Sequence, residues 1–153
     1  MKRFAVLMLA LVLVFSCTAA LAQQQVDCPV GGFSLVLPDQ FREGPLDPVT
    51  NPELCLYWYT RDNSLSIQAY ASYLGEIAFS DLFQVLDGSE KVSGELYIND
   101  MRMMYARTET SILYSWMDRG NNVTIYFIFT ANDPSVLNTV DEIMSSITFD
   151  AGH

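Results

Sequence analysis

Two apolar runs decide the fold: ILYSWMD at residues 112–118 and VTIYFIFT at residues 123–130. Both are rich in β-branched and aromatic residues, which favour strands. Between them, Gly120-Asn121-Asn122 tolerates the positive φ that a tight hairpin turn demands. The sequence therefore predicts two long antiparallel strands joined by a short turn.

Further strands are predicted on either side of this hairpin. In residues 65–72, apolar residues alternate with polar ones, which is typical of a half-buried strand. Asn99-Asp100 predicts a tight turn, and four prolines make residues 38–52 a loop. The predicted strand segments are residues 33–37, 53–60, 65–72, 91–98 and 101–109, with a short terminal strand at 148–149.

Two helices complete the predicted fold. In residues 79–86, apolar residues recur at a spacing of three and four, as on one face of a helix. Near the C-terminus, Asp133 is a good N-cap and Pro134 suits the first helical position. Asp141 and Glu142 are expected to point into water, away from the apolar face. That face is formed by Leu137, Val140, Met144 and Ile147. The predicted fold class is α+β, an antiparallel sheet of about six or seven strands with two helices packed on it.

Residues 1–22 are typical of a secretory signal peptide. A basic start at residues 1–3 and an apolar run at 4–15 precede Ala20-Leu21-Ala22, the small-x-small pattern that signal peptidase reads. The run is shorter than the roughly 20 residues that a spanning helix needs, and no later segment is apolar for long enough. We expect cleavage after Ala22, which leaves residues 23–153 as one secreted or periplasmic domain. Lipid anchoring at Cys17 is the less favoured alternative, since bulky Phe15 stands two residues before it.

Removal of the signal peptide makes the net charge of the chain more negative. The full chain of 153 residues has 8 basic and 18 acidic residues. Without Lys2 and Arg3, 131 residues carry 6 basic groups against 18 acidic ones, a net charge of −12. An acidic chain argues against nucleic acid as a partner, because that partner recruits Lys and Arg.

The cysteines of the mature chain are Cys28 and Cys55. An even pair in a chain bound for an oxidising compartment predicts a disulfide, with two buried thiols as the alternative. Such a bond would pin the proline-rich loop between them.

The order of motifs resembles the PsbP-like superfamily of exported domains. The opening strand reads Gly32-Phe33-Ser34-Leu35-Val36-Leu37-Pro38, and a helix leads into Ser146-Ile147-Thr148-Phe149 at the end of the chain. The resemblance covers most of residues 32–149, with Phe41 standing in for the tryptophan usual after the proline. It implies an α/β/α sandwich with a non-catalytic binding or assembly role. No catalytic or metal-binding residue carries over.

Familiar catalytic patterns are absent from the sequence. The single histidine, His153, is the last residue, and a chain end is poorly suited to hold a general base. Two cysteines and one histidine cannot supply a zinc finger, so we expect no metal site and no cofactor. Oxygen-rich turns at 61–63 and 118–122 lack calcium-loop spacing and are interpreted as turns.

Aromatic residues are the remaining candidates for a binding site. Period-two alternation places Tyr57 and Tyr59 on one face of their strand and Trp58 on the other. One face of the sheet is expected to be core, and the other is mixed in character. Either a helix covers that mixed face, or it is a partly exposed aromatic platform that binds a ligand or partner. The candidate platform residues are Tyr57, Tyr59, Tyr114, Trp116 and Tyr126.

Three functional hypotheses follow. The favoured one is an exported, non-catalytic binding or assembly module for an unknown protein or small-molecule ligand. The second is a small exported hydrolase that uses paired carboxylates. The third is an inhibitor of a secreted enzyme that acts through the loop at residues 38–52.

Overall fold

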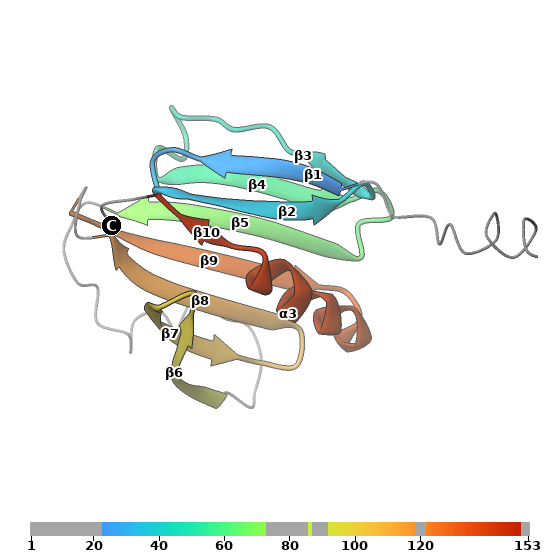
Figure 1. The fold of residues 1–153 in the computed structure, drawn as a ribbon. Coiled ribbons are helices and arrows are strands. Elements are labelled where there is room, and N and C mark those ends of the chain that lie inside the picture. The colour runs from blue at the N-terminus through green and yellow to red at the C-terminus, as the bar shows by residue number, and fades with distance from the viewer. Residues whose placement is uncertain (1–22, 73–85, 87–91, 119–121, 151–153) are drawn as a thin grey trace, which may run out of the picture.

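The computed structural model describes residues 23–72, 86, 92–118 and 122–150, which form two antiparallel sheets and a C-terminal helical segment (Figure 1). The larger sheet has seven strands in the order β3-β4-β5-β9-β8-β7-β6, and the smaller has three in the order β1-β2-β10. The strands are β1 (Gln23–Cys28), β2 (Phe33–Pro38), β3 (Phe41–Glu43), β4 (Leu54–Thr60), β5 (Leu65–Ser72), β6 (Val92–Ile98), β7 (Met101–Arg107), β8 (Ser111–Asp118), β9 (Val123–Ala131) and β10 (Thr148–Phe149).

The predicted hairpin is confirmed as β8 and β9, at the centre of the larger sheet. Its register pairs Tyr114 with Phe127 and Trp116 with Ile125. The other predicted strands also form, each within two residues of its expected ends. At the predicted turn between β6 and β7, Asn99 and Asp100 both have positive φ, as a two-residue hairpin turn requires. Of the other predicted turn, Asn122 is described and has φ 55°, while residues 120 and 121 lie outside the described residues.

The predicted antiparallel sheet of six or seven strands is present as the seven-stranded sheet, but the opening strand belongs to a second sheet that was not predicted. β2 pairs with β1 along its whole length and with β10 near its start, and with no strand of the larger sheet. β1 begins with three glutamines, so only Val26 and Cys28 give it a buried side. The segment 38–52 is also not all loop, since Phe41 at the start of β3 pairs with Thr60 of β4.

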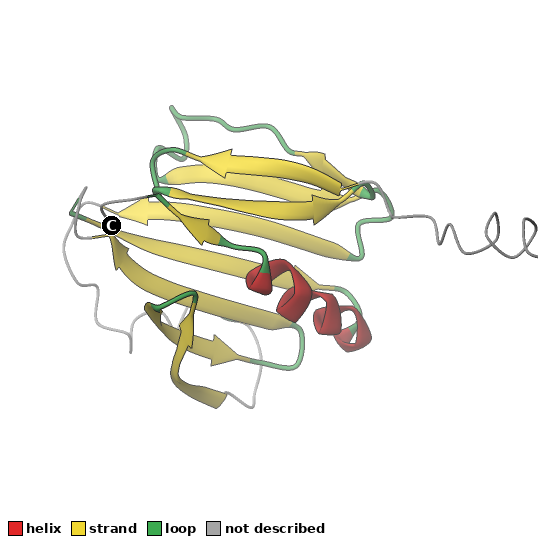
Figure 2. Ribbon diagram, in the orientation of Figure 1, coloured by secondary structure: helices red, strands yellow, loops and turns green. Residues whose placement is uncertain are grey.

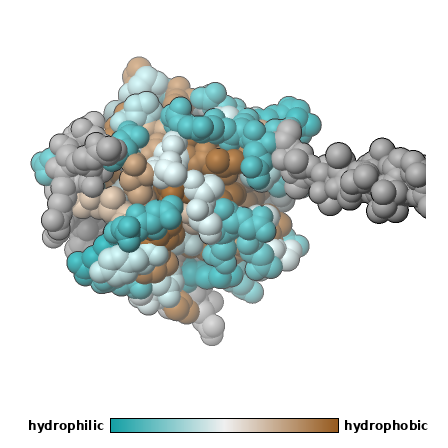
Figure 3. All heavy atoms as spheres, viewed as in Figure 1, coloured by the Kyte–Doolittle hydropathy of each residue, from teal (hydrophilic) through white to brown (hydrophobic). Residues whose placement is uncertain are grey.

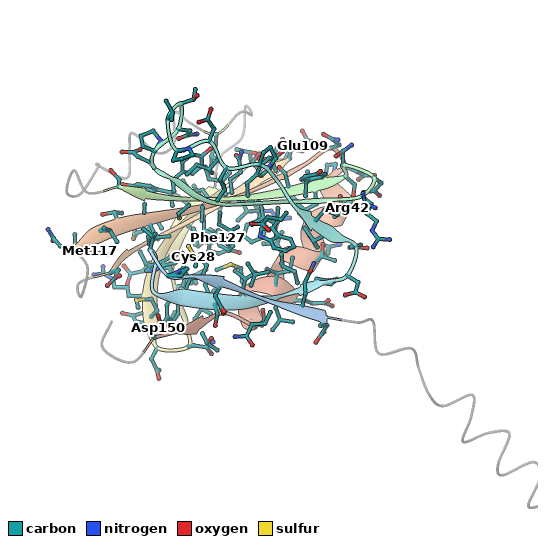
Figure 4. All side chains as sticks on the ribbon, turned by 90° about the horizontal axis from the view of Figure 1, so that it is seen from above. Cys28, Arg42, Glu109, Met117, Phe127 and Asp150 are labelled. Carbon is teal, nitrogen blue, oxygen red and sulfur yellow. The ribbon has the colours of Figure 1, made fainter. Side chains whose placement is uncertain are left out.

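The smaller sheet and the helical segment cover the same face of the larger sheet, here called the inner face (Figure 2). Seen from above, Phe127 and Cys28 lie between the two sheets, whereas Arg42 points away from them (Figure 4). Edge-on aromatic contacts fill this space: the ring centroids of Phe33 and Trp116 are 5.3 Å apart, and those of Phe127 and Phe129 are 4.8 Å apart. On the outside, hydrophilic residues cover most of the side that carries the helix, with smaller apolar areas between them (Figure 3).

The C-terminal helical segment begins where the sequence predicts. The Asp133 side chain accepts a hydrogen bond from the Ser135 amide, and Pro134 opens a 3₁₀ turn, η1 (Pro134–Leu137), which continues into α3 (Asn138–Ser145). The four predicted apolar residues of its face are all buried, while Asp141 and Glu142 are exposed. Within the described ranges, no helix is long and apolar enough to cross a membrane. The other predicted helix, at 79–86, lies outside the described residues except for Leu86, and so do the predicted signal peptide and His153.

Candidate binding surface

Two of the five candidate aromatics belong to the core. Tyr114 and Trp116 lie on the inner face because they pair across β8 and β9 with Phe127 and Ile125. Only 5% of Tyr114 and 3% of Trp116 is exposed. Burial raises the pKa of the Tyr114 phenol to about 12, the largest effect on that group. The structure therefore places both residues in the core between the sheets.

A third candidate, Tyr126, lies on the opposite, outer face of the larger sheet and is also buried. It packs with Leu86, Ala106 and Leu113, partly covered by Tyr70 and Ile128. Among the described residues, Leu86 therefore packs on the outer face at Tyr126.

The remaining two candidates form a pair on the outer face of β4. Tyr57 and Tyr59 are half-buried, with ring centroids 5.7 Å apart and planes inclined by 38°. Trp58 between them points to the inner face and packs on the core, as the alternation predicts. Across the sheet, Tyr57 lies opposite Gln68 and Tyr59 opposite Ser66, so polar neighbours flank the rings.

Tyr70 joins this pair, although the sequence analysis did not select it. It stands two residues after Gln68 on the same face of β5, and it is half-buried. Burial raises the pKa of the Tyr70 phenol, and nearby Tyr57 raises it further. A hydrogen bond with the Asn51 side chain opposes this rise. The alternation of residues 65–72 already placed Tyr70 on the polar side of its strand, and that was the signal that could have found it.

The loop that joins β3 to β4 (Figure 1) is held at both ends, by contacts with Tyr57 and Tyr70. At one end the Gly44 amide donates to the Tyr57 carbonyl at 2.8 Å. A Cβ atom on Gly44 would lie 2.2 Å from a ring carbon of Tyr57, so the loop backbone sits directly on the ring. At the other end Asn51 bonds to Tyr70, and the Ala71 amide donates to the Glu53 carbonyl at 2.8 Å.

Asp47 braces the middle of the loop. Its carboxylate accepts from the Val49 amide at 3.0 Å, the Thr50 amide at 3.2 Å and the Thr50 hydroxyl at 2.5 Å. These bonds, led by that of the Thr50 hydroxyl, hold the pKa of Asp47 below its usual range. The turn presents two apolar side chains to solvent: Leu46 is 43% exposed and Val49 is 91% exposed. We call Tyr57, Tyr59, Tyr70, Leu46 and Val49 the tyrosine surface.

The two predicted disulfide partners face each other between the sheets. The sulfur atoms of Cys28 and Cys55 are 3.5 Å apart and both residues are present as thiols. The disulfide itself therefore stays a prediction.

The oxygen-rich turn at residues 61–63 is held by its own hydrogen bonds. The Asp62 carboxylate accepts hydrogen bonds from the Ser64 amide at 3.0 Å and from the Ser64 hydroxyl at 2.8 Å. A hydrogen bond from the Thr60 side chain has the largest effect on Asp62, and together with the bonds from Ser64 it lowers the pKa of Asp62 to about 2. Within the described residues, no three His, Cys, Asp or Glu side chains are grouped to hold a metal ion.

Comparison with known proteins adds the fold relationship. No protein-family model and no curated protein matches the sequence. The solution structure of cyanobacterial PsbP (CyanoP) from Synechocystis sp. PCC 6803 matches with a TM-score of 0.59 and 9% identity, over 86% of this chain and 95% of that one. A crystal structure from Bacteroides thetaiotaomicron VPI-5482 matches with a TM-score of 0.54 and 14% identity, over 84% of this chain and 49% of that one, so this chain spans about half its length. The chain has a PsbP-like fold, as the sequence resemblance predicted.

Proposed function

We propose that this protein is an exported, non-catalytic binding module that docks a partner protein on the tyrosine surface. The observation that carries the proposal is the braced loop: Asp47 fixes a turn that holds Val49 in solvent, and the ends of this loop contact Tyr57 and Tyr70. A turn whose backbone is already fixed loses little conformational freedom when a partner covers it.

The tyrosines suit the same role. Tyr57 and Tyr59 offer large ring area with a hydroxyl at the edge, the combination enriched at the energetic centres of protein interfaces. The chemistry of the partner follows from the surface: an apolar pocket for Val49, with basic groups at its rim to complement an acidic chain.

Two further features support the wider proposal. The basic, apolar and small-residue pattern of residues 1–22 supports export. The PsbP-like fold and the lack of a recognisable catalytic motif in the sequence support a non-catalytic role. The hydrolase hypothesis stays an untested alternative. The inhibitor hypothesis is a narrower form of the proposal, because it uses the same loop.

Site-specific crosslinking tests the proposal. The photoreactive residue p-benzoylphenylalanine is placed at position 49 in the full chain, expressed with its own N-terminal segment in the organism that makes it. The control carries it at Tyr97, which is 67% exposed on β6 at the opposite edge of the sheet. We expect a discrete protein adduct from position 49 only. Equal adducts from both positions, or none from position 49, would refute the proposal. An adduct with a secreted enzyme whose activity falls on binding would favour the inhibitor form.

A further inference from the structure

The two cysteines lie on different sheets and point toward each other. Cys28 is the last residue of β1, and Cys55 belongs to β4. Both side chains belong to the inner-face core, where Cys28 is 1% exposed and Cys55 is half-buried. Apart from the backbone itself, no covalent link joins the two sheets in the described part of the chain.

The local backbone directs the sulfur atoms of Cys28 and Cys55 toward each other. The register of β4 against β5 shifts between Leu54 and Leu56, so that Cys55 is an extra residue with no partner opposite. Such a shift re-aims a side chain, and here it turns Cys55 inward together with Leu56. On the other side, the Gly31 amide donates to the Cys28 carbonyl at 3.0 Å and fixes the turn that follows β1.

We propose that Cys28 and Cys55 are joined in the exported protein by a disulfide that clamps the smaller sheet to the larger one, and that Cys55 reacts first. The proposal does not rest on the binding function of the tyrosine surface. An S–S bond is about 2.05 Å long, so the two sulfur atoms have only about 1.5 Å to close.

The chemistry is thiol–disulfide exchange with a disulfide-bearing oxidoreductase of the exported space. Cys55 is the more exposed residue of the pair, and in the proposed order its thiolate attacks the disulfide of the oxidoreductase, forms a mixed disulfide and releases one thiol of that enzyme. The Cys28 thiolate then attacks the Cys55 sulfur and displaces the second thiol. The two cysteines lose two protons and two electrons, and the oxidoreductase leaves as a dithiol.

The environment of Cys28 suits the second step. Its sulfur lies 3.5 Å from the Cys55 sulfur, the atom that it must attack to resolve the mixed disulfide. Because Cys28 is buried and Cys55 is half-buried, the assignment of Cys28 as the resolving cysteine rests on this position and on the lower exposure of Cys28.

Peptide mapping tests the bond. The full chain is exported into an oxidising compartment, its free thiols are blocked with iodoacetamide, and the protein is digested with trypsin without reductant. Cleavage after Arg42 and Arg61 puts the two cysteines on different peptides. We expect one joined peptide pair that separates on reduction. Two alkylated, unjoined peptides would overturn the proposal.

Single variants test the order of reaction. Cys28→Ser should accumulate a mixed disulfide between Cys55 and the oxidoreductase, whereas Cys55→Ser should not. Trapping on Cys28 instead would overturn the assignment of Cys55 as the first to react.

Hydrogen exchange tests the clamp. Reduction should speed amide exchange in β1 several-fold in the wild type and leave the double variant Cys28→Ala/Cys55→Ala unchanged. Identical exchange in the oxidised and reduced wild type would contradict the clamp, even if the bond forms.

Discussion

Truncating Phe127 to alanine should destabilise the protein more than any surface change. Phe127 is fully buried between the sheets, with ring centroids 5.6 Å from Phe33 of the smaller sheet, 6.3 Å from Trp116 and 4.8 Å from Phe129. Loss of the ring removes apolar contact on both sheets and leaves a cavity, which for Phe→Ala in a core costs about 3–5 kcal/mol.

Urea denaturation of the mature protein measures this effect. With a slope of about 2 kcal/mol per M, a loss of about 4 kcal/mol moves the midpoint down by about 2 M. The matched control is Tyr97→Ala, an aromatic truncation at a residue 67% exposed, for which the expected change is within about 0.5 kcal/mol. A loss below about 1 kcal/mol for Phe127→Ala, or an equal loss for the control, would refute the packing of the smaller sheet on Phe127.

Three further predictions concern stability. Burial raises the pKa of Tyr114 to about 12, above its value of about 10 in an unfolded chain, so the contribution of the neutral phenol to the free energy of unfolding is complete below pH 10 and falls as the pH rises toward 12. In urea denaturation at several pH values, Tyr114→Phe should remove this part of the stability loss at high pH. A pH dependence that is unchanged in Tyr114→Phe would contradict the prediction. Gly44→Ala should cost about 1–3 kcal/mol, since its Cβ would meet the Tyr57 ring at 2.2 Å; a neutral result would mean that the loop does not rest on the ring. A Cys28–Cys55 disulfide would close a loop of 28 residues, and its reduction should lower the free energy of unfolding by about 3.6 kcal/mol in the chain-entropy model. A urea midpoint that is the same with and without reductant would argue against the bond.

The strands were predictable because alternation and turn residues mark them locally. Asn99-Asp100 and the apolar runs of β8 and β9 needed no knowledge of the rest of the chain. The second sheet was not predictable in this way. Its first strand, β1, has two buried apolar side chains among glutamines, and only pairing with β2 makes it a strand.

The candidate site was predictable only in part. Alternation correctly separated Tyr57 and Tyr59 from Trp58 within β4. It could not show that Tyr114 and Trp116 belong to the core face, because β8 is buried on both sides and its sequence is apolar on both. The hydrogen bonds of Asp47 within its turn could not be predicted either, because a proline-rich loop sequence does not show which side chain holds the turn.

The most direct test of docking on the tyrosine surface is the affinity of the crosslinked partner, once purified, for variants of the residues of this surface. Tyr59→Ala should weaken binding at least tenfold, about 1.4 kcal/mol, as expected of an aromatic at the centre of an interface. Tyr97→Ala should leave the affinity unchanged, and circular dichroism should show both variants folded. Equal affinities for the wild type and Tyr59→Ala would contradict the account.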